Sequence, residues 1–286
     1  MNPLRLLVLL VSLPLLLGGC GVEGPVTSLK YEIKGDSITI TGCDENAFGK
    51  LIIPAAIEGK PVTSIGDEAF FLCSSLTSIT IPDSVTSIGY GAFQVCSSLT
   101  SITIPDSVTS IGADAFQMCE SLTSANIPNG VTSIGHSAFG ACKSLLSITI
   151  PDGVTSIGDG AFNGCSSLTS ITIPDNVTSI GAVTFTGCKS LSIITIPESV
   201  TSIGNQAFRY CYKLTSITIP ESVTSIEDYA FGLCRSLTSI TFLGDTPKSG
   251  EEVFKHSDPT IYRKPEAKGW GDTFGGRPVK LISEKP

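Results

Sequence analysis

The sequence repeats itself every 23 residues along most of its length. Seven consecutive units begin at Ser74 and follow one another without an insertion, ending at Cys96, Cys119, Cys142, Cys165, Cys188, Cys211 and Cys234. A fixed period of about 20 to 50 residues is the signature of a repeat architecture in which each unit packs only on its neighbours. We therefore expect one elongated solenoid, although 286 residues would exceed the usual size of a single globular domain.

The first half of each unit predicts a short strand. In the unit 74–96, the stretch LTSITI (76–81) ends in alternating apolar and polar residues with a high β-branched content. This pattern favours a strand with Ile79 and Ile81 inward and the Ser and Thr side chains outward. Pro82 should end the strand because it lacks a backbone N–H, and Asp83-Ser84 should turn the chain.

The second half of the unit predicts a short extended segment followed by a helical turn. Val85 and Ile88 point inward from the extended segment, and Gly89 predicts a left-handed corner. Ala92, Phe93 and Cys96 have the spacing of one helical turn, so we expect a short helix or 3₁₀ turn there. No unit could bury its apolar side chains alone, and stacking at the strand spacing of about 4.7–4.9 Å would place them in continuous ladders.

The pattern SLTSITIPDSVTSIGxxAFxxC resembles the BspA-like leucine-rich-repeat family, and the resemblance covers roughly residues 31–286. It implies a leucine-rich-repeat solenoid: a right-handed, curved stack of coils with short parallel strands and short helical or 3₁₀ turns. It also implies a bacterial surface protein involved in adhesion or protein binding, without enzyme activity.

The two ends of the repeat array should be capped, because a solenoid must cover its terminal coils. Residues 31–73 predict an N-terminal cap and an imperfect first coil, with a hairpin around Gly35-Asp36 and five extra residues between Pro54 and Val62. The regular repeats occupy residues 74–243. Residues 244–286 have no 23-residue partner and predict a C-terminal cap with Trp270 as its largest apolar side chain.

The N-terminus resembles the signal of a bacterial lipoprotein. Residues 1–19 combine a short basic start with the twelve-residue apolar run Leu6–Leu17, which is too short to span a bilayer. The sequence Leu-Gly-Gly-Cys that follows resembles a lipobox and implies lipid attachment at Cys20, with residues 20–30 as a tether. We expect a protein held in the bacterial cell envelope through this lipid, at the outer membrane or cell surface. Gly21 follows the cysteine where an aspartate would affect sorting, so outer-membrane sorting stays open.

The charge composition of the chain argues against one class of binding partner. The chain has 18 Lys and Arg against 26 Asp and Glu, and the net charge of −8 would repel a phosphate backbone. Nucleic acid is therefore not expected as a partner. Only 15% of residues are charged, where about 25% is typical, so Ser, Thr, Asn and Gly must form much of the surface.

The ten cysteines first suggest disulfides in an exported chain. The period argues for a different structure, because identical inward positions on adjacent coils hold side chains parallel at strand spacing. A disulfide instead needs Cβ atoms about 3.8 Å apart that face each other. We expect a buried ladder of free thiols that pack as small apolar groups. A zinc site is not expected, because no Cys-x-x-Cys pair occurs.

Neither catalysis nor a cofactor is predicted. The two histidines, His136 and His256, lie in a variable repeat position and in the terminal segment, and no acid–base pair converges on either. An acidic or amide residue follows the proline of each coil: Asp83, Asp106, Asn129, Asp152, Asp175, Glu198 and Glu221. One carboxylate per coil falls short of the six to eight oxygens that calcium prefers, so a solvated turn explains this column without a metal.

Three non-catalytic functions stay open. The first is a surface for protein binding or adhesion. The second is a passive envelope component, because a strip of the same Ser and Thr on every coil offers few distinct contacts. The third is binding of ordered water or ice by the repeated Ser-x-Thr array, which curvature and Ile193 in a Ser position weaken.

Positions that differ from coil to coil indicate where a specific partner would bind. Near the C-terminal end of the repeats they include Arg209, Tyr210, Tyr212, Lys213 and Tyr229. Tyrosine and arginine dominate binding hot spots because they bury large areas and keep a polar group. We predict one partner-binding patch there, with scattered surface aromatics as the alternative.

Overall fold

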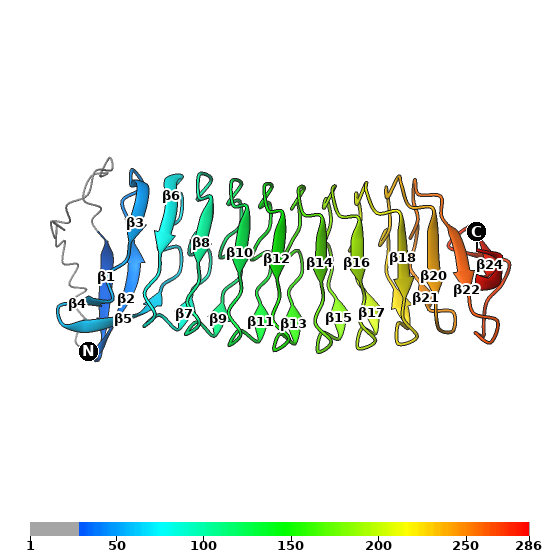
Figure 1. The fold of residues 1–286 in the computed structure, drawn as a ribbon, viewed down its shortest axis with the longest axis horizontal. Coiled ribbons are helices and arrows are strands. Elements are labelled where there is room, and N and C mark those ends of the chain that lie inside the picture. The colour runs from blue at the N-terminus through cyan, green and yellow to red at the C-terminus, as the bar shows by residue number, and fades with distance from the viewer. Residues whose placement is uncertain (1–28, 286) are drawn as a thin grey trace, which may run out of the picture.

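The computed structural model describes residues 29–285, which form a parallel β-solenoid of about ten turns. The coils stack along the long axis of the molecule, from the N-terminal hairpin to the C-terminal strands (Figure 1). The predicted signal peptide (1–19), Cys20 and all but the last two residues of the predicted tether (20–30) lie outside the described residues. No helix among residues 29–285 is long and apolar enough to cross a membrane.

Two rows of strands run along the stack (Figure 1). One row contains β3 (Phe48–Ile52), β6 (Ser75–Thr80), β8 (Ser101–Thr103), β10 (Ser124–Asn126), β12 (Ser147–Thr149), β14 (Ser170–Thr172), β16 (Ile193–Thr195), β18 (Ser216–Ile219), β20 (Ser239–Phe242), β22 (Thr260–Arg263) and β24 (Arg277–Leu281). The other contains β1 (Lys30–Lys34), β2 (Ser37–Gly42), β5 (Lys60–Ile65), β7 (Ser87–Ile88), β9 (Ser110–Ile111), β11 (Ser133–Ile134), β13 (Ser156–Ile157), β15 (Ser179–Ile180), β17 (Ser202–Ile203), β19 (Ser225–Ile226) and β21 (Lys248–Ser249). Three short elements, β4 (Ala56–Ile57), β23 (Thr273–Phe274) and the 3₁₀ helix η1 (Ile282–Glu284), complete the chain.

The register between coils equals the sequence period. Ile79 of β6 pairs with Ile102 of β8, 23 residues later, and the other repeat strands pair in the same way. Each inward position therefore stacks on its equivalent in the next coil. Pairing is interrupted between β12 and β14 and between β16 and β18 in the first row, and between β13 and β15 in the second.

A stack of phenylalanines runs through the core. Nine rings, one per coil from Phe70 to Phe254, lie nearly parallel with centroids 5.1–5.9 Å apart. All nine side chains are buried, as are the Leu, Ile and Val ladders beside them. The core predicted from the repeat is confirmed.

The ladder of free, buried thiols is also confirmed, and each thiol has a partner that the sequence did not reveal. The S–H of Cys96 donates to the carbonyl of Phe70 in the preceding coil at 3.2 Å, and this contact recurs up to Cys234 at 3.0–3.3 Å. Burial raises the pKa of Cys119 to about 12, because the apolar core disfavours the thiolate. At the end of the ladder Ser257 occupies the cysteine position and donates to the carbonyl of Phe231 at 2.6 Å.

The segment predicted as a short helix or 3₁₀ turn is instead a chain of tight turns. Alternate N–H groups bond within the coil and to the next coil: Phe71 N–H donates to Glu68 O, whereas Phe70 N–H donates to Ala92 O. Two residues per coil, such as Gly91 and Val95, have positive φ values, which a right-handed helix cannot contain. The prediction of helical turns was therefore wrong, because the apolar spacing of one helical turn also fits this turn.

The left-handed corner predicted at Gly89 was also wrong, since Gly89 is not among the residues with positive φ. Glycine is required there by close approach of the coils. A Cβ on Gly89 would lie 2.7 Å from the carbonyl carbon of Gly66, and one on Gly112 would lie 2.6 Å from that of Gly89.

The two ends of the stack are covered in different ways. The predicted hairpin around Gly35-Asp36 is confirmed: β1 and β2 pair antiparallel, and β2 then pairs in parallel with β5. The extra residues in the first coil form β4, which pairs with β5. At the C-terminal end Trp270 is half-buried and packs against Phe242 and Phe274, with centroids 4.9 and 5.4 Å away.

Candidate functional site

The first candidate surface is the strand face, which is the exposed side of the row from β6 to β20. Its side chains are mainly the Ser and Thr of each coil. The threonine just before each strand serves the fold: Thr100 Oγ1, for example, donates to the carbonyl of Thr77 in the preceding coil at 3.1 Å. The outward Ser and Thr of the strands themselves, such as Ser101 and Thr103, repeat one chemistry from coil to coil.

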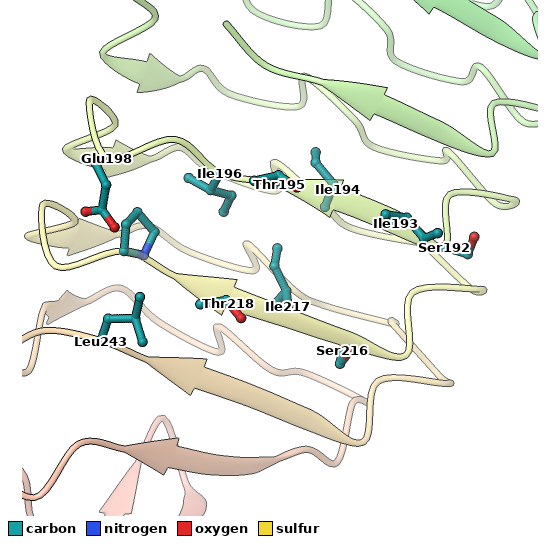
Figure 2. A pocket seen from close by; sticks show the side chains of 11 residues that line it. Ser192, Ile193, Ile194, Thr195, Ile196, Glu198, Ser216, Ile217, Thr218 and Leu243 are labelled. Atoms are coloured by element: carbon teal, nitrogen blue, oxygen red, sulfur yellow. The ribbon is translucent and has the colours of Figure 1, made fainter. Parts of the chain in front are cut away.

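The regular spacing of the strand face is interrupted by a cleft. A cleft of about 430 Å³ lies where β16 and β18 are not paired. Ser192, Ile193, Thr195, Ser216 and Thr218 line it (Figure 2). Ile193 occupies a Ser position and is 68% exposed. Glu198 is the one ionisable side chain of the lining, so the cleft contains no pair of groups for acid–base chemistry.

The second candidate surface is the turn face, formed in each coil by the segment equivalent to residues 90–98. Three of the five predicted site residues interact there around Arg209. The Arg209 guanidinium carbon lies 4.7 Å from the ring centroid of Tyr210 and 5.6 Å from that of Tyr229 on the next coil. Tyr212 joins them through an edge-to-face contact with Tyr210 at 6.1 Å. Lys213 is exposed and makes none of these ring contacts.

Two further cations extend this group. Arg235 lies 5.4 Å from the ring of Tyr212, and Lys255 lies 5.4 Å from the ring of Tyr229. The sequence contained a signal for both: Arg235 follows Tyr212 by one period, and Lys255 follows Arg209 by two. The aromatic–cation cluster is the set Arg209, Tyr210, Tyr212, Tyr229, Arg235 and Lys255.

Hydrogen bonds fix the centre and one edge of the cluster. Arg209 Nη1 donates to Gln206 Oε1 at 2.9 Å, whereas the buried Nε of Arg209 has no hydrogen-bond partner among residues 29–285. Lys255 Nζ donates to Glu252 Oε2 at 2.7 Å and holds the pKa of that carboxyl below its ordinary value. A hydrogen bond to Glu252 raises the pKa of Tyr229. Arg209, Tyr229 and Lys255 are therefore each held by a neighbouring side chain of the turn face.

The described part of the chain contains no group of three or more His, Cys, Asp or Glu side chains that could hold a metal ion. His136 and His256 lie on different coils of the turn face. In the acidic column after the prolines, Glu221 is paired with Lys264 at 2.5 Å. The aromatic–cation cluster is therefore the candidate binding surface among residues 29–285.

Comparison with known proteins agrees with this architecture. The BspA type leucine rich repeat region matches in six copies over residues 41–167 and 132–260. Among solved structures, a leucine-rich repeat protein from Bacteroides ovatus is similar, with 30% identity, a TM-score of 0.64, and 89% of this chain and 75% of that chain covered. A leucine rich repeat protein from T. pallidum is similar over 65% of this chain and 87% of that chain, with 32% identity and a TM-score of 0.61.

No curated protein matches the sequence. The family match covers most of the chain and coincides with the coils whose ladders form the core. The chain therefore belongs to the BspA-type leucine-rich-repeat family.

Proposed function

We propose that this protein is a bacterial surface lipoprotein, anchored through Cys20, that binds a protein partner with the aromatic–cation cluster. The family and the extended solenoid support a binding role, because repeat solenoids present large continuous surfaces.

The single observation that carries the proposal is the arrangement around Arg209. Its guanidinium group lies between rings that belong to two neighbouring coils, so three tyrosines and three cations form one connected surface. Such side chains supply most of the binding energy of protein interfaces, and fixing them in advance reduces the entropy lost on binding. The strand face, in contrast, presents the same hydroxyls on coil after coil.

The experiment is a pull-down with the full chain, followed by measurement of the dissociation constant for the captured protein. The double variant Tyr210→Ala with Tyr212→Ala should weaken binding by roughly 2 kcal/mol or more. Tyr90→Ala is the matched control, because Tyr90 is 46% exposed on the turn face of a distant coil. An unchanged dissociation constant in the double variant, with circular dichroism showing an intact fold, would move the site to the strand face.

The anchor has its own test. Cys20→Ala should leave the chain without lipid, because no other cysteine of the N-terminal segment follows an apolar run. The variant should then leave the membrane fraction in detergent-free buffer, whereas the unaltered chain stays there. Retention of the variant in that fraction would contradict anchoring through Cys20.

A second candidate function is that of a passive envelope component without a specific ligand. The uniform strand face favours it, since identical coils provide little basis for discrimination between partners. The same pull-down separates the two functions: a passive component captures no protein whose retention depends on Tyr210 and Tyr212.

A further inference from the structure

The turn face near the aromatic–cation cluster carries cations that no carboxylate neutralises. Lys189, Arg209, Lys213 and Arg235 have no carboxylate oxygen within 4.0 Å among the described residues. Lys189, Tyr212 and Arg235 occupy the same position of three consecutive coils. The phenylalanine rings of these coils are 5.5 and 5.3 Å apart, so the backbone positions of Lys189 and Arg235 lie about 11 Å apart with that of Tyr212 between them.

Three acidic residues close to the cluster are already engaged. Glu227 Oε2 accepts a backbone N–H of the preceding coil at 2.9 Å, and Asp228 Oδ1 accepts one of the following coil at 2.7 Å. Glu252 is paired with Lys255. Glu227 and Asp228 thus link neighbouring coils, and none of these three carboxylates forms an ion pair with Lys189, Arg209, Lys213 or Arg235.

On the turn face, the segments 182–190, 205–213 and 228–236 contain four cations against one acidic residue, Asp228. The five preceding turn-face segments, from 67–75 to 159–167, contain five Asp and Glu against one cation, Lys143, which is paired with Glu120 at 2.7 Å. An acidic partner would therefore be repelled along the middle of the solenoid and attracted to the coils around Arg209.

Resting on the proposed function, we propose that the partner of the aromatic–cation cluster is a protein segment rich in Asp and Glu. Its carboxylates accept hydrogen bonds from Arg209, Lys213 and Arg235, while its apolar stems pack on the tyrosine rings. Arginine presents a planar set of N–H donors that matches a carboxylate, and among residues 29–285 only Nη1 of the Arg209 guanidinium donates a hydrogen bond, so Nη2 remains available. Charge attraction brings the segment to the patch, and the three rings supply the apolar contact area.

The test is fluorescence anisotropy of a labelled glutamate decapeptide with the full chain in an uncharged detergent. A lysine decapeptide and heparin serve as comparison probes. Lys213→Glu with Arg235→Glu should weaken binding of the glutamate peptide by about tenfold or more, because two attractive contacts become repulsive. Lys50→Glu with Lys280→Glu is the matched control: it makes the same change in net charge at exposed positions outside the cluster and should leave binding within about twofold.

Three results would overturn the inference. The first is equal weakening in the cluster variant and in the control variant, which would mean that net charge alone acts. The second is binding of heparin without binding of the glutamate peptide, which would assign the cluster to an anionic polysaccharide. The third is that a protein is captured and its binding depends on Tyr210 and Tyr212 but not on Lys213 and Arg235. That result would support the proposed function and contradict the inference that the partner is acidic.

Discussion

Replacing Phe139 with alanine would test whether the stacked phenylalanines hold neighbouring coils together. Phe139 is fully buried near the middle of the stack, with Phe116 at 5.2 Å and Phe162 at 5.9 Å between ring centroids. Loss of a buried phenylalanine side chain costs about 3–5 kcal/mol, and each stacked aromatic pair contributes about 0.5–1.5 kcal/mol more. We expect the free energy of unfolding to fall by about 5 kcal/mol.

Phe70 provides the matched control. It is equally buried, but it lies at the N-terminal end of the stack and has one stacked ring, Phe93, at 5.1 Å. Phe70→Ala should therefore cost about 1 kcal/mol less than Phe139→Ala. It should also leave the contacts between the central coils intact.

The two variants should differ in the cooperativity of unfolding, because each coil of a solenoid is coupled only to its neighbours. Trp270 is the one tryptophan of the chain and reports on the C-terminal cap, whereas far-ultraviolet circular dichroism reports on the whole stack. In Phe139→Ala the two signals should separate along the urea axis, since the weakened central contact lets the halves unfold independently. A single coincident transition with a loss below about 1 kcal/mol would refute the reasoning.

The remaining predictions concern the glycine column and the thiol ladder. Gly112→Ala should lower the free energy of unfolding by several kcal/mol, because the added Cβ would lie 2.6 Å from the backbone of Gly89. Gly130→Ala is the control: the nearest atoms to its Cβ would be 3.5 Å away, so the free energy of unfolding should change by no more than about 0.5 kcal/mol. Urea unfolding measures both values. Cys119 and Cys165 should react with iodoacetamide only after denaturation, and modification in the native state would contradict their burial. The pKa of these two thiols in the folded chain is about 12, above the ordinary value of 9.0. Their contribution to the free energy of unfolding is therefore complete below pH 9. It falls between pH 9 and pH 12 by roughly 1 kcal/mol per thiol for each pH unit, because the unfolded chain loses these protons first. Chemical denaturation at pH 8 and pH 10 should show this fall, and Cys119→Ala should make it shallower; an identical slope in the variant would contradict the assignment.

The strands, the inward ladders and the register could be predicted from the sequence because the period and the alternation depend on local sterics that repeat in every coil. The turns could not be distinguished from helices, since Ala92, Phe93 and Cys96 have the same apolar spacing in both. Glycines at positions 91 and 160, equivalent in the repeat, were a signal for positive φ that this spacing concealed. The glycine at position 89 was assigned the wrong cause, because a left-handed corner and a close backbone approach both require the absence of a Cβ.

For the candidate site, sequence reasoning could find the aromatic residues but not the full set of their contacts. Tyr210, Tyr212 and Arg209 are close in the chain, so their proximity in space was expected. Arg235 and Lys255 are distant in the chain and are brought to the same rings by the stacking of coils. Reading the sequence in columns of 23 residues would have placed Arg235 beside Tyr212. Burial of the Arg209 Nε depends on side-chain orientation and was not predictable from spacing.

The geometry of the coils decides where this protein can carry specificity. A change in an inward column disturbs a ladder that passes through every coil, and a change at the threonine just before a strand, such as Thr100, removes a hydrogen bond to the preceding coil. The turn-face positions of Arg209, Tyr212 and Arg235 lie outside the ladders, so residues of different size and charge can occupy them without breaking the stack. Because each coil repeats these positions at nearly constant spacing, side chains on neighbouring coils form a two-dimensional array. A partner that contacts two or three coils is then recognised by a combination of side chains, and the aromatic–cation cluster is the combination in which rings and unneutralised cations meet.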